Sequence, residues 1–391
     1  MKNFSAQYII TNTGPLLKRG IVTTDDDGTV VAIHDTGGSL EENQSIEFYN
    51  GILIPGFVNC HCHIELSHMK GSIARKGRLG SFIEKVRTTR DTNSENITDS
   101  IYQADRSMFK EGIVSCADIC NTSLSFSMKR ESIISYTNLL EVFGTDPDKA
   151  GHRMEEINKV AIAAKSMNLP FSFVPHAVYS TSLPLFRLLR KQSENNTVTS
   201  IHFMETEGEK QFLEDNTGPL SISYQHSGLI PPKLETVKNH VDAILNEITL
   251  NGNLILVHNT FADKNTIRKI RERKNLFWCL CPNSNLYIEN TLPPLDLLIN
   301  EGCEIVVGTD SLASNTRLSI FEELKTLQSG FPSLTVEELV RWSTINGARA
   351  LAEDDRFGKI EPGKKPGLLI LRNVDLINMR LLPDSYVTRL I

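Results

Sequence analysis

The sequence predicts an α/β fold, a TIM-like (β/α)8 barrel with a small β module beside it. Eight short apolar runs alternate with longer helical stretches in the middle of the chain, which is the pattern of repeated βα units. The length of 391 residues exceeds one ordinary compact domain and suits a large barrel that carries a smaller module. We therefore expect the barrel at residues 51–351 and the module at residues 1–50 and 352–391.

The β module is predicted from both ends of the chain. Residues 8–11 and 29–33 form short apolar runs separated by glycine-containing turns, which is typical of a small antiparallel unit. Strand-like character returns at residues 368–371, after the last helical stretch. The C-terminal tail is therefore expected to join the N-terminal segment in one β module.

The barrel elements follow in order along the chain. The expected strands are residues 54–61, 112–118, 139–143, 170–175, 198–202, 254–258, 276–280 and 304–309. The clearest helices are expected at residues 98–110, 148–167, 234–250, 263–273 and 319–329, several of them opened by a Thr, Asp or Ser cap. Residues 77–96 and 208–233 are the longest stretches interpreted as irregular, and such rim segments often act as lids.

Composition and charge limit the classes of function. The 41 basic and 47 acidic residues give a net charge of -6 and are scattered, so no nucleic-acid surface is expected. No run of about 20 apolar residues predicts a membrane span, and no signal peptide is recognised. The 7 cysteines do not form a disulfide framework, which favours a reducing cytoplasm. A small-molecule substrate is expected.

His61 and His63 are the first candidate metal-binding residues. They lie two residues apart at the end of the first barrel strand, so the strand period places both imidazoles on one side. Cys60 and Cys62 alternate with them and should point outward as small hydrophobic residues. On its own this short motif would favour two polar residues that point into a loop.

Other strand ends strengthen the interpretation. His202 ends the fifth expected strand, His258 ends the sixth, and Asp310 follows the eighth. Active-site groups of such barrels collect at the C-terminal ends of the strands. Glu205 follows His202 by three residues and can serve as a proton shuttle beside a metal, although a solvated loop acid is the simpler alternative for it.

The sequence resembles the amidohydrolase superfamily over nearly its whole length, in particular the cytosine deaminase and chlorohydrolase-like branch. The segments that carry the resemblance are 55–63, 174–180, 281–286, 308–311, 344–351 and 360–364. The resemblance implies a barrel with a composite β-sandwich built from both termini. The metal ligands that it implies are His61, His63, His202 and Asp310.

The resemblance also implies roles around the metal. Glu205 would be the acid and base, His258 would orient the water or the tetrahedral intermediate, and Asp310 would help to deprotonate the water. His176 would contact the substrate, and it stands where binuclear relatives carry a bridging carboxylated lysine. One divalent metal is therefore expected, with zinc as the first choice and iron or manganese as alternatives. A homodimer is the oligomeric state that the resemblance suggests.

Three further residues connect the chain with aminodeoxyfutalosine deaminases. Glu65, Ser67 and Arg90 follow the metal pair in a pattern similar to that group. They would bind a purine nucleoside-like substrate if they reached the ligand. The alternative is that Arg90 is a solvated helix residue and Glu65 a local hydrogen-bond partner.

The resulting prediction is hydrolytic deamination of an amino-substituted N-heterocycle, such as a nucleobase or nucleoside, by a metal-activated water. One alternative is the same machinery acting on another C–N or C–Cl bond, in a cyclic amide, an imidazolone or a chlorinated ring. Another is a catalytically silent barrel kept for binding. The intact set of candidate ligands and proton shuttle argues against the silent barrel.

Overall fold

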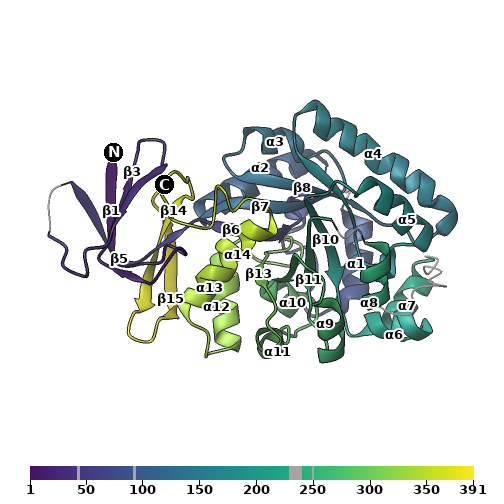
Figure 1. Ribbon diagram of the computed structural model, residues 1–391. Helices are drawn as coiled ribbons and strands as arrows, with labels where there is room; N and C mark the ends of the chain where they lie inside the picture. The colour runs from purple at the N-terminus through teal and green to yellow at the C-terminus, as the bar shows by residue number, and fades with distance from the viewer. Residues whose placement is uncertain (42–44, 91–93, 229–239, 249–250) are drawn as a thin grey trace.

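The computed structural model describes residues 1–41, 45–90, 94–228, 240–248 and 251–391. The molecule is elongated, with a β module at one end and a larger α/β part at the other (Figure 1). Both termini lie in the β module (Figure 1). No helix in the described ranges is long and apolar enough to cross a membrane.

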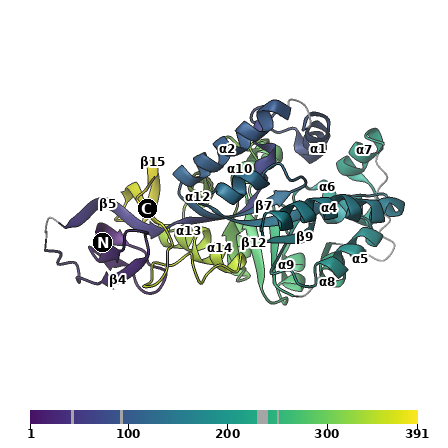
Figure 2. The same ribbon diagram turned by 90° about the horizontal axis from the view of Figure 1, so that it is seen from above.

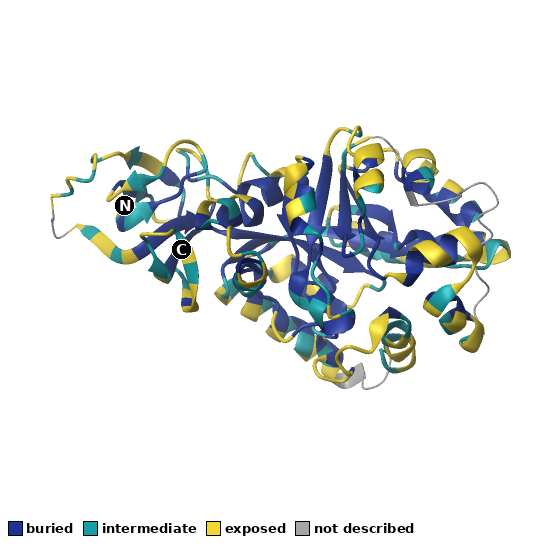
Figure 3. Cartoon of the chain, turned by 90° about the horizontal axis from the view of Figure 1, so that it is seen from below, coloured by how far each residue is buried: buried dark blue, intermediate teal, exposed yellow. Residues whose placement is uncertain are grey.

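Two parallel sheets form the centre of the α/β part. The first has the order β6 (Phe57–Cys62), β7 (Ile113–Cys120), β8 (Ser135–Val142), β9 (Phe171–Pro175). The second has the order β10 (Val198–Phe203), β11 (Asn253–His258), β12 (Leu276–Leu280), β13 (Ile305–Val307). Strands β6, β7 and β10 are buried along their whole length, as expected for parallel strands covered by helices (Figure 3).

The two sheets meet at both edges. Cys62 pairs with Asp310 in a parallel bridge, and Ala177 pairs with His202 in another. The eight strands are therefore arranged in chain order in a TIM-barrel-like α/β fold. Each of the eight runs predicted from the sequence contains a strand of these two sheets, although the bounds differ by a few residues and the first run is divided.

Helices surround these sheets (Figures 1 and 2). Four predicted helices are confirmed as α2 (Ser94–Lys110), α4 (Ala150–Ser166), α9 (Lys264–Ile270) and α12 (Ile320–Gly330). The fifth contains α8 (His240–Glu247), while its residues 234–239 and 249–250 lie outside the described part of the chain. Further α-helices are α3 (Phe126–Glu131), α5 (Leu183–Gln192), α10 (Pro282–Ile288), α11 (Leu295–Asn300), α13 (Val336–Ser343) and α14 (Ile345–Ala350). Short 3-10 helices occur at η1 (Ile64–Met69), η2 (Pro147–Lys149) and η3 (Val178–Ser180).

The prediction of irregular structure at residues 77–96 and 208–233 is wrong for their described parts. The first contains α1 (Arg78–Thr89), and the second contains α6 (Gly208–Asp215) and α7 (Gly218–His226). In α1 the apolar residues recur at helical spacing, at Leu79, Phe82, Ile83 and Val86. Helices α1 and α7 lie side by side (Figure 2), where Ser223 Oγ donates to the Gly80 carbonyl at 3.4 Å. Residues 91–93 and 229–233 lie outside the description.

The first predicted strand, at residues 54–61, is in fact divided between two sheets. Strand β5 (Ile46–Pro55) belongs to the β module, and β6 begins only at Phe57. Gly56 separates them, and its amide donates to the Pro366 carbonyl at 3.1 Å. A Cβ at this position would approach that carbonyl oxygen to 2.7 Å, so glycine allows the chain to change sheets here.

The β module is one sheet of seven strands. Its order is β15 (Arg380–Arg389), β14 (Leu368–Asp375), β5, β1 (Lys2–Ile9), β3 (Ile21–Thr24), β4 (Val30–His34), with β2 (Leu17–Lys18) beside β1. The C-terminal strands thus join the N-terminal ones as predicted. The expectation of a purely antiparallel unit is wrong, because β1 and β5 pair in parallel. The hydrogen bonds join these strands in a single sheet and do not define two facing sheets. The sandwich therefore stays a prediction.

A substitution at Gly51, in β5, tests how closely β5 packs against the C-terminal strand β14. It has a φ of +129°, and a Cβ there would overlap the carbonyl oxygen of Leu371 on β14. We expect Gly51→Ala to lower the free energy of unfolding by about 1–3 kcal/mol, since backbone must move to make room. Gly14→Ala is the control, because nothing lies within 4 Å of a Cβ at Gly14. Equal urea midpoints for both variants would contradict this packing.

Candidate metal centre and active site

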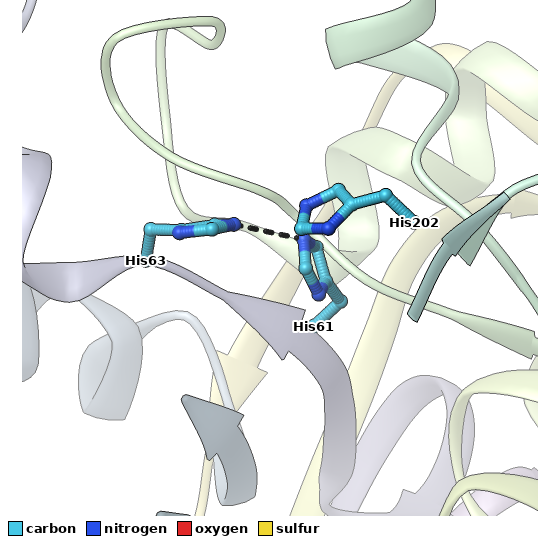
Figure 4. A group of neighbouring side chains, drawn as sticks. All are labelled: His61, His63 and His202. Carbon is cyan, nitrogen blue, oxygen red and sulfur yellow. Dashed lines mark hydrogen bonds between the residues drawn. The ribbon is translucent and has the colours of Figure 1, made fainter. Parts of the chain in front are cut away.

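Three buried imidazoles meet where the strands end. His61 lies in β6, His63 directly follows it, and His202 comes from β10 (Figure 4). Their candidate ligand atoms all lie within 4.8 Å of one another. The Nε2 atoms of His61 and His63 are 3.1 Å apart. The structure therefore brings together the three histidines that the sequence singled out.

Asp310 adds a carboxylate to this group. Its Oδ1 lies 3.5 Å from His63 Nε2 and 3.7 Å from His61 Nε2. Its Oδ2 accepts hydrogen bonds from Ser284 Oγ and Ser314 Oγ, both at 2.6 Å. The two hydroxyls hold the carboxylate so that the other oxygen faces the imidazoles.

Hydrogen bonding defines the free nitrogen of His202. Its Nδ1 donates to the carbonyl oxygen of His176 at 2.8 Å, with Glu141 Oε1 at 3.6 Å on the same side. A proton on Nδ1 leaves the lone pair on Nε2, which is the tautomer that a metal ligand needs.

His258 and Glu205 form a second pair beside the first group. His258 Nδ1 lies 2.9 Å from Asn285 Oδ1 and donates to it, because an amide oxygen can only accept. Its Nε2 lies 3.6 Å from Glu205 Oε1. The backbone amide of Glu205 donates to Glu209 Oε2 at 2.9 Å. This hydrogen bond holds the loop that follows β10 and carries Glu205.

Strand ends at the site adopt unusual backbone conformations. His258 has a φ of +76°, Asp310 of +55° and Met204, next to Glu205, of +47°. Such conformations cost a non-glycine residue about 1–3 kcal/mol and are found where function requires a particular side-chain direction. His258 and Asp310 are themselves candidate site residues, and Met204 directly precedes Glu205.

The protonation states suit a cation site. Burial lowers the pKa of His61 well below its usual range, and His63 adds to this effect. Burial also lowers the pKa of His202 and of His258. Burial would raise the pKa of Asp310, but the surrounding imidazoles, His63 first, hold it below its usual range. Neutral imidazoles and an ionised carboxylate are the forms in which these groups bind metals.

The pKa of Glu205 moves in the opposite direction. Burial raises it well above the usual range, and the carboxylates of Asp310 and Glu209 raise it further. In the absence of a cation, burial therefore favours the protonated form of this carboxyl group more than it would for an exposed glutamate. A group in this state can donate a proton, and the approach of a cation would favour its ionised form.

A divalent cation fits the residues present. Two neutral imidazoles facing each other through Nε2 can share only one proton, and the third imidazole and Oδ1 of Asp310 add two more lone pairs. One cation would satisfy all four groups at once. Cys60 and Cys62 are fully buried and belong to hydrophobic clusters, and neither is among the candidate ligands of the described residues.

A cavity of about 480 Å³ opens onto this group. Its lining includes His63, His202, Glu205, His258 and Asp310. The opposite wall is apolar and comes from η1 and α1, with Leu66, Leu79, Phe82, Ile83 and Val86. Basic residues also line it: Arg87 of α1, Arg90 directly after α1, and Lys149 and Arg153 near the start of α4. The cavity is large enough for a small heterocyclic substrate.

The predicted substrate-contacting residues fall into two groups. His176 and Arg90 line the cavity. The ring of His176 is fixed by Ser180, whose Oγ lies 2.7 Å from Nδ1. Glu65 and Ser67 are buried and are not among the lining residues. Glu65 instead accepts hydrogen bonds from the amides of residues 121 and 122, so substrate contact by Glu65 and Ser67 stays a prediction.

Sequence reasoning assigned no role to several residues that hold the site. These are Ser284, Asn285, Ser314 and Glu209. Ser284 and Asn285 lie in a segment that carried the family resemblance, which was the signal available for them. Ser314 and Glu209 had no such signal, because they lie outside the segments that carried the resemblance. Their hydrogen bonds to Asp310 and to the Glu205 amide are seen only in the folded structure.

Known proteins resemble this chain along most of its length. Adenosine deaminase of Helicobacter pylori is 26% identical over 337 residues, covering 83% of this chain and 79% of that protein. The structure of H. pylori aminofutalosine deaminase in complex with methylthio-coformycin has a TM-score of 0.76 at 23% identity, covering 95% of this chain and 92% of that one.

An adenosine deaminase from Xanthomonas campestris with bound zinc has a TM-score of 0.68 at 20% identity, covering 97% of this chain and 86% of that one. These two structures show a common fold. The Amidohydrolase family model matches residues 52–384, which include every candidate ligand described above. The chain therefore belongs to the amidohydrolase family.

Proposed function

We propose that this protein is a metal-dependent hydrolytic deaminase of an amino-substituted N-heterocycle. The observation that carries the proposal is that one cavity is lined by His63, His202 and Asp310 together with the Glu205 and His258 pair, and that His61 is buried directly beside His63. The names of the relatives, adenosine deaminase and aminofutalosine deaminase, support a purine nucleoside-like substrate.

The proposed cofactor is one divalent metal ion, with zinc first and iron or manganese as alternatives. His61, His63, His202 and Asp310 would hold it. Such an ion polarises water and lowers its pKa from 15.7 towards about 7. The zinc-bound structure of the Xanthomonas relative supports zinc as the first choice.

The proton transfers are assigned to Glu205. In the overall reaction water supplies the oxygen of a new C–O bond, the C–N bond breaks, and ammonia leaves. Glu205 takes a proton from the water and gives one to the departing nitrogen, so one carboxyl group acts first as base and then as acid. Its burial in the cavity wall supports this role, because burial raises the pKa of the carboxyl group and so favours the form that can donate a proton to the leaving nitrogen.

Three neighbours orient the reacting groups. His258 presents Nε2 beside Glu205 and is held through Nδ1 by Asn285, so it can orient the water or the addition intermediate. Asp310 would help to deprotonate the water in addition to its place in the cluster. His176 faces the same cavity and contacts the substrate ring.

A closed barrel and a β-sandwich are also part of this proposal. We take the two four-stranded sheets as halves of one (β/α)8 barrel at residues 51–351, supported by the bridges at both edges. Residues 1–50 and 352–391 form the composite β-sandwich, with β5 extending to Pro55. A homodimer and a cytoplasmic location stay predictions.

A substrate panel tests the activity. Ammonia release is measured with adenosine, 5′-deoxyadenosine, guanine, aminopyrimidines and pterins as the amino-bearing compounds. Turnover of at least one of them is expected. No ammonia from any of them, with turnover of a cyclic amide, an imidazolone or a chlorinated ring, would favour the alternative chemistry on another C–N or C–Cl bond.

Replacing the proton shuttle should abolish turnover without loss of metal. We expect Glu205→Gln to lower kcat by about 10²–10⁴-fold, because an amide cannot relay the proton. Metal content measured by elemental analysis should stay at the wild-type value. Glu207→Gln is the control, since Glu207 is exposed in the same loop and should keep full activity. Unchanged kcat in Glu205→Gln would refute the assigned role.

Metal removal should be reversible. Dialysis against a chelator is expected to abolish ammonia release, and one equivalent of zinc per chain should restore it. Binding of the metal to the folded state also raises the melting temperature by mass action. Full activity of protein that contains less than about a tenth of an equivalent of any divalent metal would contradict the proposal.

A further inference from the structure

A buried carboxylate on β7 supports the chain directly after His63. Asp118, which is fully buried, accepts a hydrogen bond through Oδ1 from the backbone amide of Ile64 at 2.8 Å. Ile64 follows His63 immediately, and His63 itself has a φ of -125° and a ψ of 77°, outside both helix and regular strand. The direction of the chain at His63 therefore depends on a side chain from the neighbouring strand.

A second carboxylate makes the same kind of contact, from the segment after β6 to the backbone after β7. Glu65, in η1, accepts hydrogen bonds from the backbone amides of Asn121 and Thr122 at 3.2 to 3.3 Å, just beyond the end of β7. The segment after β6 is thus bonded to β7, and the segment after β7 is bonded to η1. This reciprocal pair is called here the Asp118–Glu65 clamp.

Lys129 of α3 supplies the positive charge for the clamp. Its Nζ lies 2.6 Å from Asp118 Oδ2 and 3.0 Å from Cys120 Sγ, and its side chain is fully buried. The rings of Phe126 and Tyr136 lie 5.7 and 5.3 Å from the same nitrogen. An isolated charge in such surroundings is very costly, so the lysine and the aspartate stabilise each other.

The two sides of His61 and His63 are then held by different means. On the β13 side, the amides of Thr309 and Asp310 donate to the His61 carbonyl at 3.0 Å. On the β7 side, the backbone pairing of β6 with β7 reaches Cys62 and Asp118, and beyond it the tie to the Ile64 amide is made by the Asp118 side chain, which is paired with Lys129. The second tie is therefore the one that substitutions can remove.

We infer that Asp118 and Lys129 are positioning residues of the metal site, which hold the His63 imidazole in place through the backbone of Ile64. This inference rests on the proposed metal site, and neither residue lines the cavity. Groups that orient ligands from behind commonly change metal affinity by about 10–100-fold. The competing view is that the ion pair serves only the stability of the fold, and buried ion pairs can often be replaced by apolar residues without loss.

Two double variants separate these views. Lys129→Met with Asp118→Asn removes both charges but keeps an oxygen that can accept from the Ile64 amide. Lys129→Met with Asp118→Leu removes the charges and the acceptor. The zinc dissociation constant is measured for each by competition with a chromogenic chelator, and the melting temperature of the metal-free protein is measured beside it.

The inference predicts that zinc binds about tenfold more weakly to the Leu variant than to the Asn variant. Amide hydrogen exchange at Ile64 in the metal-free proteins should be faster in the Leu variant as well. Equal zinc affinity of the two variants, within twofold, with equal exchange at Ile64, would overturn the inference.

Glu353→Gln is the matched control. Glu353 accepts hydrogen bonds from Ser115 and Ser135, at the opposite ends of β7 and β8, and should affect the melting temperature but not zinc affinity. If the Leu variant does not fold, Glu65→Leu replaces it, and weaker zinc binding than wild type is again expected. Wild-type protein that binds no zinc would refute the proposed metal site itself, a result distinct from equal binding by the variants.

Discussion

The site depends above all on the backbone hydrogen bonds between the ends of β13 and β6. The carbonyl oxygen of His61 accepts from the amides of both Thr309 and Asp310. Asn59 reinforces this edge, because its side chain is bonded to both the amide and the hydroxyl of Thr309. Strand β13 is thereby attached to β6. As a result, the carboxylate of Asp310, 249 residues further along the chain than His61, lies beside the His61 imidazole.

The cavity combines two kinds of surface. One end is the polar cluster of imidazoles and carboxylates, and the other is the apolar face of α1 with Arg87 and Arg90 at its C-terminal end. A substrate that fits both has a polar ring for the metal end and a less polar remainder. Because α1 packs on α7 and α10, the shape of this wall depends on neighbouring helices at the rim.

The sequence predicts the strands and the histidines at their ends well. The reason is local: buried parallel strands read as continuous apolar runs, and a histidine that follows such a run stands out. The sequence prediction misses helix α1 although its apolar residues have helical spacing, and Gly77 and Gly80 interrupt the pattern at its start. The parallel pairing of β1 with β5 could not be inferred, since it depends on which strand lies next to β1 in space.

The contacts that hold the site were the least predictable. Ser314 next to Asp310, Glu209 next to Glu205, and Asp118 beneath Ile64 are ordinary residues by type and spacing. Their roles follow from hydrogen bonds formed only in the fold. Glu65 illustrates the limit well: its position after the metal pair indicated a substrate contact, whereas its carboxylate bonds the backbone at residues 121 and 122.

We propose that one metal is held by His61, His63, His202 and Asp310, and that Cys60 and Cys62 are not ligands. X-ray absorption spectroscopy of the zinc-loaded protein tests this ligand set directly. We expect a shell of nitrogen and oxygen neighbours at about 2.0–2.1 Å with scattering from three imidazoles and no sulfur. A sulfur shell at about 2.3 Å would contradict it, because a cysteine would then be a ligand.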